Sequence, residues 1–175
     1  MRQEEMKHID KHIRRLSLNL PLVEDKPGGS WVIASKQMHN LLTAYWACRR
    51  ETAGPDFNLN LTIELAEDVG PVPCDYAVLM LDIIDECVRY IGYRADGTPS
   101  VEVRLSEMAR YAGLSNFVLD IVNRGPKLPQ SRVLSDGLLR LRDRIAEWNG
   151  SLEVDQSCVD RISFRAALPI VSISY

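Results

Sequence analysis

The feature that most restricts the fold of this chain is the changing period of its apolar residues. In some segments they recur every three or four positions, which is typical of helices, and in others they alternate with polar residues, which is typical of half-buried strands. Helical spacing covers approximately residues 3–19, 31–48, 76–94 and 132–148. Alternation covers approximately residues 57–65, 99–108, 115–123, 151–155 and 161–170. Elements mixed in this order predict an α/β chain, more specifically an α+β two-layer sandwich with helices on one face of a mixed sheet.

The composition fits one globular domain and argues against several functions. With 175 residues, of which 46% are apolar and 26% charged, the chain can bury a core of its own. Its net charge of −3 is spread along the sequence without a basic stripe, so we expect no direct binding of nucleic acid. The N-terminus is charged from Arg2 onward and lacks the apolar core of a signal peptide or a membrane span, so we expect a cytoplasmic protein.

The cysteine residues give no sign of a metal site. The cysteines are far apart, without a histidine at ligand spacing, so we expect reduced and mostly buried thiols. They are Cys48, Cys74, Cys87 and Cys158. His8 and His12 lie one helical turn apart and could accept a phosphoryl group or bind a metal, although a solvated helix face is the simpler interpretation. His39 lies beside the apolar stripe of its helix, where we expect a structural histidine.

The first helix is predicted to form a separate region, residues 1–24, which precedes the main domain, residues 25–175. A narrow apolar stripe runs along this helix, and a segment with two prolines and two glycines follows it. The stripe consists of Met6, Ile9, Ile13, Leu16 and Leu20. Because such stripes are typically buried between paired helices, we expect a homodimer held by this helix. Two alternatives stay open: the helix folds back on its own domain, or it joins the helix bundle of another protein.

Three stretches carry a resemblance to a known family. They are "IIDECVRYIGYR" (83–94), "VNRGPKLP" (122–129) and "GLLRLRDRIAEWNGSLEV" (137–154). In this order they resemble the ATP-binding catalytic domain of sensor histidine kinases, a GHKL-type domain, and most of all the kinases that sense nitrate or sugar phosphates. The resemblance extends from about Leu20 to Ile170. The first helix is similar to the second helix of that family's dimerisation hairpin, and the helix that carries the phosphorylated histidine has no counterpart in this sequence.

The resemblance implies a nucleotide site in which several residues are changed. On the long helix the family's Glu matches Glu86, its magnesium-binding Asn matches Tyr90, and its His matches Arg94. A phenol is a poor ligand for magnesium at neutral pH, and its ring is far larger than an amide. Tyr90 is therefore expected either to fill the former pocket or to lie on the surface of a helix that has lost its original role.

The other two stretches are changed as well. In the adenine loop the family's Asp is Asn123, which keeps a carbonyl acceptor but loses the charge. The first glycine of that loop is Gly125, and the next is replaced by Lys127. In the phosphate lid only Gly137 of a glycine-rich stretch remains, and Asp136 places a negative charge where phosphates would arrive. We therefore expect no catalytic residue, no bound cofactor and no metal.

These changes favour a non-catalytic regulatory protein of bacterial signal transduction, a pseudokinase. It would keep the kinase-like domain in order to bind a sensor kinase, a response regulator or a transcription factor. The alternative is a histidine kinase fragment that binds ATP weakly, or a histidine phosphotransferase that acts through His8, His12 or His39. A third possibility is an anti-sigma-type regulator, since those proteins share the fold.

Overall fold

The computed structural model describes most of the main domain. The described residues are 23–24, 31–52, 59–95, 97–109, 115–125, 134–157 and 161–170. The predicted first helix, with its apolar stripe and with His8 and His12, lies outside them, as do Lys127 and Cys158. Within these ranges, no helix is both long and apolar enough to cross a membrane.

Helices and strands follow one another in an order close to that predicted. Their bounds are β1 Val23–Glu24, β2 Trp31–Ile33, α2 Ser35–Thr52, β3 Asn60–Leu65, β4 Val72–Pro73, α3 Cys74–Gly92, β5 Ser100–Ala109, β6 Ser115–Asn123, α4 Asp136–Glu147, β7 Ser151–Asp155 and β8 Ile162–Ile170. The alternating segments 99–108 and 115–123 are β5 and β6, and the segments 151–155 and 161–170 are β7 and β8. Each of these two pairs is antiparallel.

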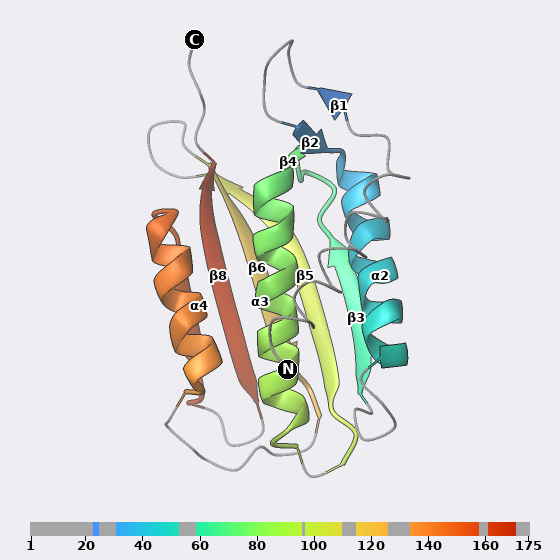
Figure 1. The fold of residues 1–175 in the computed structure, drawn as a ribbon, viewed down its shortest axis with the longest axis vertical. Coiled ribbons are helices and arrows are strands. Elements are labelled where there is room, and N and C mark those ends of the chain that lie inside the picture. Colours follow the sequence, from blue (N-terminus) through green and yellow to red (C-terminus); the bar gives the residue numbers. More distant parts are fainter. Residues whose placement is uncertain are drawn as a thin grey trace.

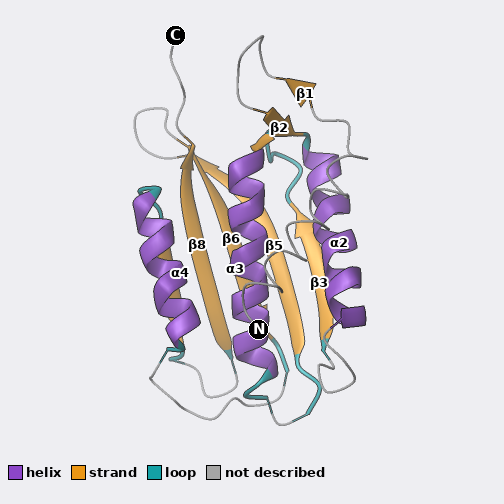
Figure 2. Cartoon of the chain, in the orientation of Figure 1, coloured by secondary structure: helices purple, strands orange, loops and turns teal. Residues whose placement is uncertain are grey.

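Two layers make up the domain. A five-stranded sheet has the order β3-β5-β6-β8-β7, in which β3 and β5 are parallel and all other neighbours are antiparallel. The helices α2, α3 and α4 lie side by side on one face of this sheet, with α3 in the middle (Figures 1 and 2). The predicted sandwich, with helices on one face of a mixed sheet, is confirmed.

The core lies between the two layers and is built from the predicted apolar faces. The stripe of α3 is at most 2% exposed at each position. It consists of Ala77, Leu81, Ile84, Val88 and Ile91. On the sheet, Val101, Val103 and Leu105 of β5 face these helices and are also buried, whereas their neighbours Glu102 and Arg104 face away. Burial of these apolar side chains supplies most of the driving force for folding.

A small second sheet was not predicted from the sequence. It has the order β1-β2-β4, so Trp31 lies in a strand and not at the start of a helix, and α2 begins only at Ser35. Similarly, Val72–Pro73 forms a strand inside a segment predicted to be a loop. Strands of two or three residues are too short to show alternation, and Trp31 matched the helical spacing of α2 by coincidence.

α4 ends in a left-handed turn. Asn149 has a φ of 56°, the conformation in which helices commonly end. Gly150 comes next, and a Cβ there would lie 2.6 Å from the carbonyl oxygen of Ala167, so the turn has no room for a side chain.

Two predictions about single residue types need correction. Cys87 is buried as predicted, but Cys48 and Cys74 are only half-buried. His39 is exposed, so it is not a structural histidine of the core. Both residues Cys48 and His39 lie on α2, whose apolar stripe is narrow and leaves its flanks open to solvent.

Candidate functional site

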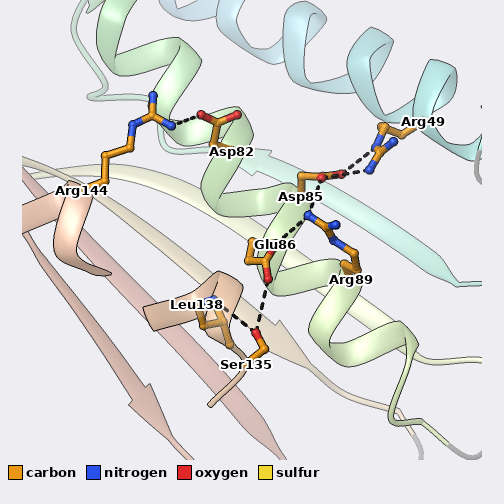
Figure 3. A network of polar contacts seen from close by, with 8 residues as sticks. All are labelled: Arg49, Asp82, Asp85, Glu86, Arg89, Ser135, Leu138 and Arg144. Atoms are coloured by element: carbon orange, nitrogen blue, oxygen red, sulfur yellow. Dashed lines mark hydrogen bonds and ion pairs between the residues drawn. The ribbon is translucent and has the colours of Figure 1, made fainter. Parts of the chain in front are cut away.

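The side of α3 that faces away from the sheet carries a network of charged side chains, here called the α3 polar network (Figure 3). It joins all three helices of the layer. Its members are Arg49 of α2, Asp82, Asp85, Glu86 and Arg89 of α3, Ser135 just before α4, and Arg144 within α4. Figure 3 shows Arg49 and Arg144 approaching α3 from opposite sides.

Asp85 is the centre of the contact between α2 and α3. The Arg49 guanidinium donates two hydrogen bonds to it, Nε to Oδ1 at 2.7 Å and Nη2 to Oδ2 at 3.0 Å. Arg89, one turn further along α3, donates to the same carboxylate at 3.4 Å. Only 14% of the Asp85 side chain is exposed, and paired hydrogen bonds of this kind fix the orientation of both groups.

Glu86 lies against the beginning of α4. Arg89 Nη2 donates to its Oε2 at 2.6 Å, and Ser135 Oγ donates to its Oε1 at 3.3 Å. Ser135 is also the N-cap of α4, since its Oγ accepts the N–H of Leu138 at 3.2 Å. A carboxylate is favoured at this place because the N-terminal end of a helix carries partial positive charge.

Gly137 has a packing role in this contact. A Cβ at this position would lie 1.7 Å from Glu86 Oε1, so any larger residue would push the Glu86 carboxylate away from Ser135. The glycine that the sequence placed in a phosphate lid therefore lets α4 approach α3. Asp136, beside it, is exposed to solvent.

Asp82 links α3 to the middle of α4 through an ion pair with Arg144. Burial raises the pKa of the Asp82 carboxyl, and the hydrogen bond from Arg144 opposes that rise. Pairs between different helices could not be seen in the sequence, because their partners are more than thirty residues apart.

Tyr90 is buried, with 5% of its surface exposed, so it is not a surface residue. Its ring packs edge-on against Phe164 of β8 at a centroid distance of 5.8 Å. The Arg94 guanidinium stacks on the ring at 4.3 Å from its centroid, and Gln156 Nε2 donates to the phenolic oxygen at 3.2 Å. Three neighbours thus hold the ring in one orientation, and no motif in the sequence indicates Gln156 as one of them.

Asn123 and Gly125 lie at the end of β6. Asn123 is 1% exposed, and its Oδ1 accepts the N–H of Gly125 at 3.1 Å. A Cβ on Gly125 would lie 2.7 Å from the backbone nitrogen of Ser100, so the neighbouring strand requires this glycine. Asn123 is two residues from Ile121, the cross-strand partner of Phe164, so it lies on the same side of the sheet as the Tyr90 ring.

The opposite face of the sheet is polar and carries a hollow of about 400 Å³. Arg165 and Asp120 form a two-hydrogen-bond ion pair across β8 and β6 in this hollow, and Arg124 pairs with Glu102. Charged pairs directly across strands are an ordinary way to solvate an open sheet face. In the described parts of the chain, no three side chains gather as potential metal ligands.

Comparisons with known proteins bear on the fold. No family model and no curated protein sequence matches this chain. Among solved structures, the histidine kinase AdeS of Acinetobacter baumannii is 16% identical, with a TM-score of 0.56 over 97% of this chain and 80% of that one. The catalytic domain of the histidine kinase ThkA is 14% identical, with a TM-score of 0.55 over 79% of this chain and 93% of that one.

A blue-light activated histidine kinase of Erythrobacter litoralis is 13% identical, with a TM-score of 0.57 over 78% of this chain. The match covers 42% of that kinase chain, so this chain spans less than half of its length. These likenesses show the fold: the domain has the architecture of histidine kinase catalytic, ATP-binding domains, as the sequence resemblance predicted.

Proposed function

We propose that this histidine-kinase-like domain is a non-catalytic regulatory protein of bacterial signal transduction. It binds no ATP and acts by contact with a sensor kinase, a response regulator or a transcription factor. The observation that carries the proposal is the buried Tyr90 ring, which is held by Phe164, Arg94 and Gln156. The sequence resemblance matches this position to the family's magnesium-binding amide. A phenol held in this way offers no oxygen ligand of the kind that magnesium prefers.

The residues around the start of α4 support the same proposal. Glu86, a residue that the family shares, is held there by Arg89 and Ser135, so it does not itself distinguish this chain from a nucleotide-binding one. Asp136, beside Gly137, places a further negative charge at the helix end where a phosphate would bind, and like charges repel. With Tyr90 in place of the amide ligand and Asn123 in place of the Asp, the residues present at this site do not fit a magnesium nucleotide, and we derive no reaction step from one.

Thermal unfolding with and without Mg-ATP tests the proposal. A ligand at a hundred times its dissociation constant stabilises a protein by about 2.7 kcal/mol, which for a domain of this size raises the melting temperature by several degrees. We expect no shift with this chain, whereas an active histidine kinase catalytic domain measured in parallel should show one. A shift of several degrees, or incorporation of radioactive phosphate from ATP, would contradict the proposal.

The Tyr90→Asn variant sharpens this test. Restoring the amide alone should not restore ATP binding, because Asp136 would still place a negative charge at the start of α4 and Asn123 would still lack the charge of the family's Asp. If the single change produces an ATP-dependent shift, Tyr90 alone blocks the site and the other differences are without effect.

A further inference from the structure

The outer side of β3 is one of the two edges of the five-stranded sheet. β3 pairs with β5 in parallel, and its hydrogen bonds to that strand include Asn60 N–H to the Pro99 carbonyl and Ala66 N–H to the Leu105 carbonyl, both at 2.9 Å. In a parallel ladder, alternate residues face the partner strand. The N–H and C=O groups of Leu61, Ile63 and Leu65 therefore point outward, and among the described residues no strand pairs with them.

The side chains of β3 are also unusual for this sheet. Leu61, Ile63 and Leu65 face the helix layer and contact the core, yet each is only half-buried. The equivalent residues of the neighbouring strand β5 are at most 1% exposed. β3 thus has an apolar side that one more strand would cover.

Sheet edges are normally protected against further pairing by charged residues, prolines or bulges. The other edge of this sheet, β7, is a five-residue strand with two acidic side chains, Glu153 and Asp155. β3 contains no lysine or proline, and Glu64 is its one charged residue. The two edges of the sheet are therefore not equivalent, and β3 is the one suited to pairing.

The position of helix α2 restricts which partner can pair with the outer edge of β3. It packs on β3 and extends beyond it on the outer side of the sheet (Figure 1). Strands are about 4.8 Å apart and a helix with its side chains is about 10 Å wide, so an added strand would still lie beneath α2. A second copy of this chain, paired through its own β3, would bring its own α2 into the same space, where packed helix axes need about 8 to 10 Å of separation.

We propose that the outer edge of β3 receives an extended segment of a partner protein, which adds a sixth strand beneath α2. The segment has apolar residues at alternate positions, which contact Leu61, Ile63 and Leu65, and polar residues between them. A basic residue lies opposite Glu64, which has no ion pair in the described structure. This inference deepens the proposed function, because it names the surface through which a non-catalytic domain binds its partner.

The probe for this surface is the hexapeptide acetyl-Thr-Val-Lys-Val-Thr-Val-amide at millimolar concentration. Amide hydrogen exchange, followed by NMR, separates the two sides of β3 within one experiment. The inward amides of Thr62 and Glu64 are bonded to β5 and should exchange slowly throughout. We expect the peptide to slow exchange of the outward amides of Leu61, Ile63 and Leu65 at least about tenfold.

A matched pair of variants at Ile63 and a charge reversal at Glu64 test the mechanism. Ile63→Pro removes the central outward N–H and should abolish the effect of the peptide, whereas Ile63→Ala keeps that N–H and should only weaken it. Glu64→Lys leaves the backbone intact and should make a peptide with Glu in place of Lys the better ligand. Unchanged exchange at the outward amides, or equal effects in Ile63→Pro and Ile63→Ala, would overturn the proposal. Because none of these readouts involves ATP, they fail or succeed independently of the nucleotide test.

Discussion

At the scale of single residues, the contact between Gly137 and Glu86 makes one position dependent on another. In the native chain, Gly137→Ala forces Glu86 away from Ser135 and Arg89, which offsets the higher helix propensity of alanine. In a Glu86→Ala background the same change should stabilise the protein, because no carboxylate is in the way. We expect the two effects to differ by about 1 to 2 kcal/mol in a double-mutant cycle measured by urea unfolding. Equal effects in both backgrounds would show that the two residues are not coupled.

Tyr45 makes stability depend on alkaline pH. It is 6% exposed, and burial, followed by the nearby charge of Asp85, raises the pKa of its phenol well above its usual range. Above about pH 10 the phenol is deprotonated in the unfolded chain but stays protonated in the folded chain. The contribution of Tyr45 to the free energy of unfolding is therefore fully present below that pH, and the free energy falls by about 1.4 kcal/mol per pH unit above it.

Tyr45→Phe should remove this part of the slope and change little at pH 8. Urea unfolding of both proteins between pH 8 and 11 measures it, with Tyr93→Phe, at an 80% exposed position, as a control that should resemble the native protein. Parallel curves for the native chain and Tyr45→Phe would contradict the assignment.

At the scale of elements, the helix that the sequence predicts before the domain, outside the described residues, carries the prediction of a homodimer. Pairing the stripes of two copies removes five apolar side chains per chain from water, at roughly 25 cal/mol per Å² of buried surface. Sedimentation should give a dimer for the full chain and a monomer for a chain that begins at Gly28. The variant Ile13→Asp, which keeps the length but interrupts the stripe, should also be a monomer. Equal monomeric masses for all three would exclude the homodimer.

The sequence predicted long elements well and short ones poorly. The spacing of apolar residues in α3 and α4, and the alternation in β5, β6 and β8, extend over two or more periods, so each pattern is stronger than chance matches. β1, β2 and β4 are two or three residues long and depend on tertiary pairing. No local pattern could reveal them, and Trp31 was assigned to the wrong element for this reason.

At the scale of the whole molecule, the sequence identified positions of the site but not their contacts. The resemblance placed Glu86, Tyr90 and Gly137 in one region, and the structure brings Glu86 and Gly137 together. The sequence could not decide whether the Tyr90 ring is buried in the domain or lies on its surface. The answer depends on Phe164 and Gln156, which are more than sixty residues further along the chain. The links from α3 to Arg49 and Arg144 were invisible for the same reason: they exist only after three helices are packed.

The parallel pairing of β3 with β5 has a consequence for how the chain is made. The neighbours β5 and β6 are joined by a short connection, but Asn60 meets Ser100 only after the whole of α3 has been synthesised between them. Closing this longer loop costs more chain entropy, so we expect β3 to join the sheet after the hairpin has formed. At roughly 5 to 20 residues per second on the ribosome, β5 is synthesised several seconds after β3. During that interval its apolar side chains and its backbone are both without their partner strand, and we expect this unpaired strand to favour aggregation of the nascent chain.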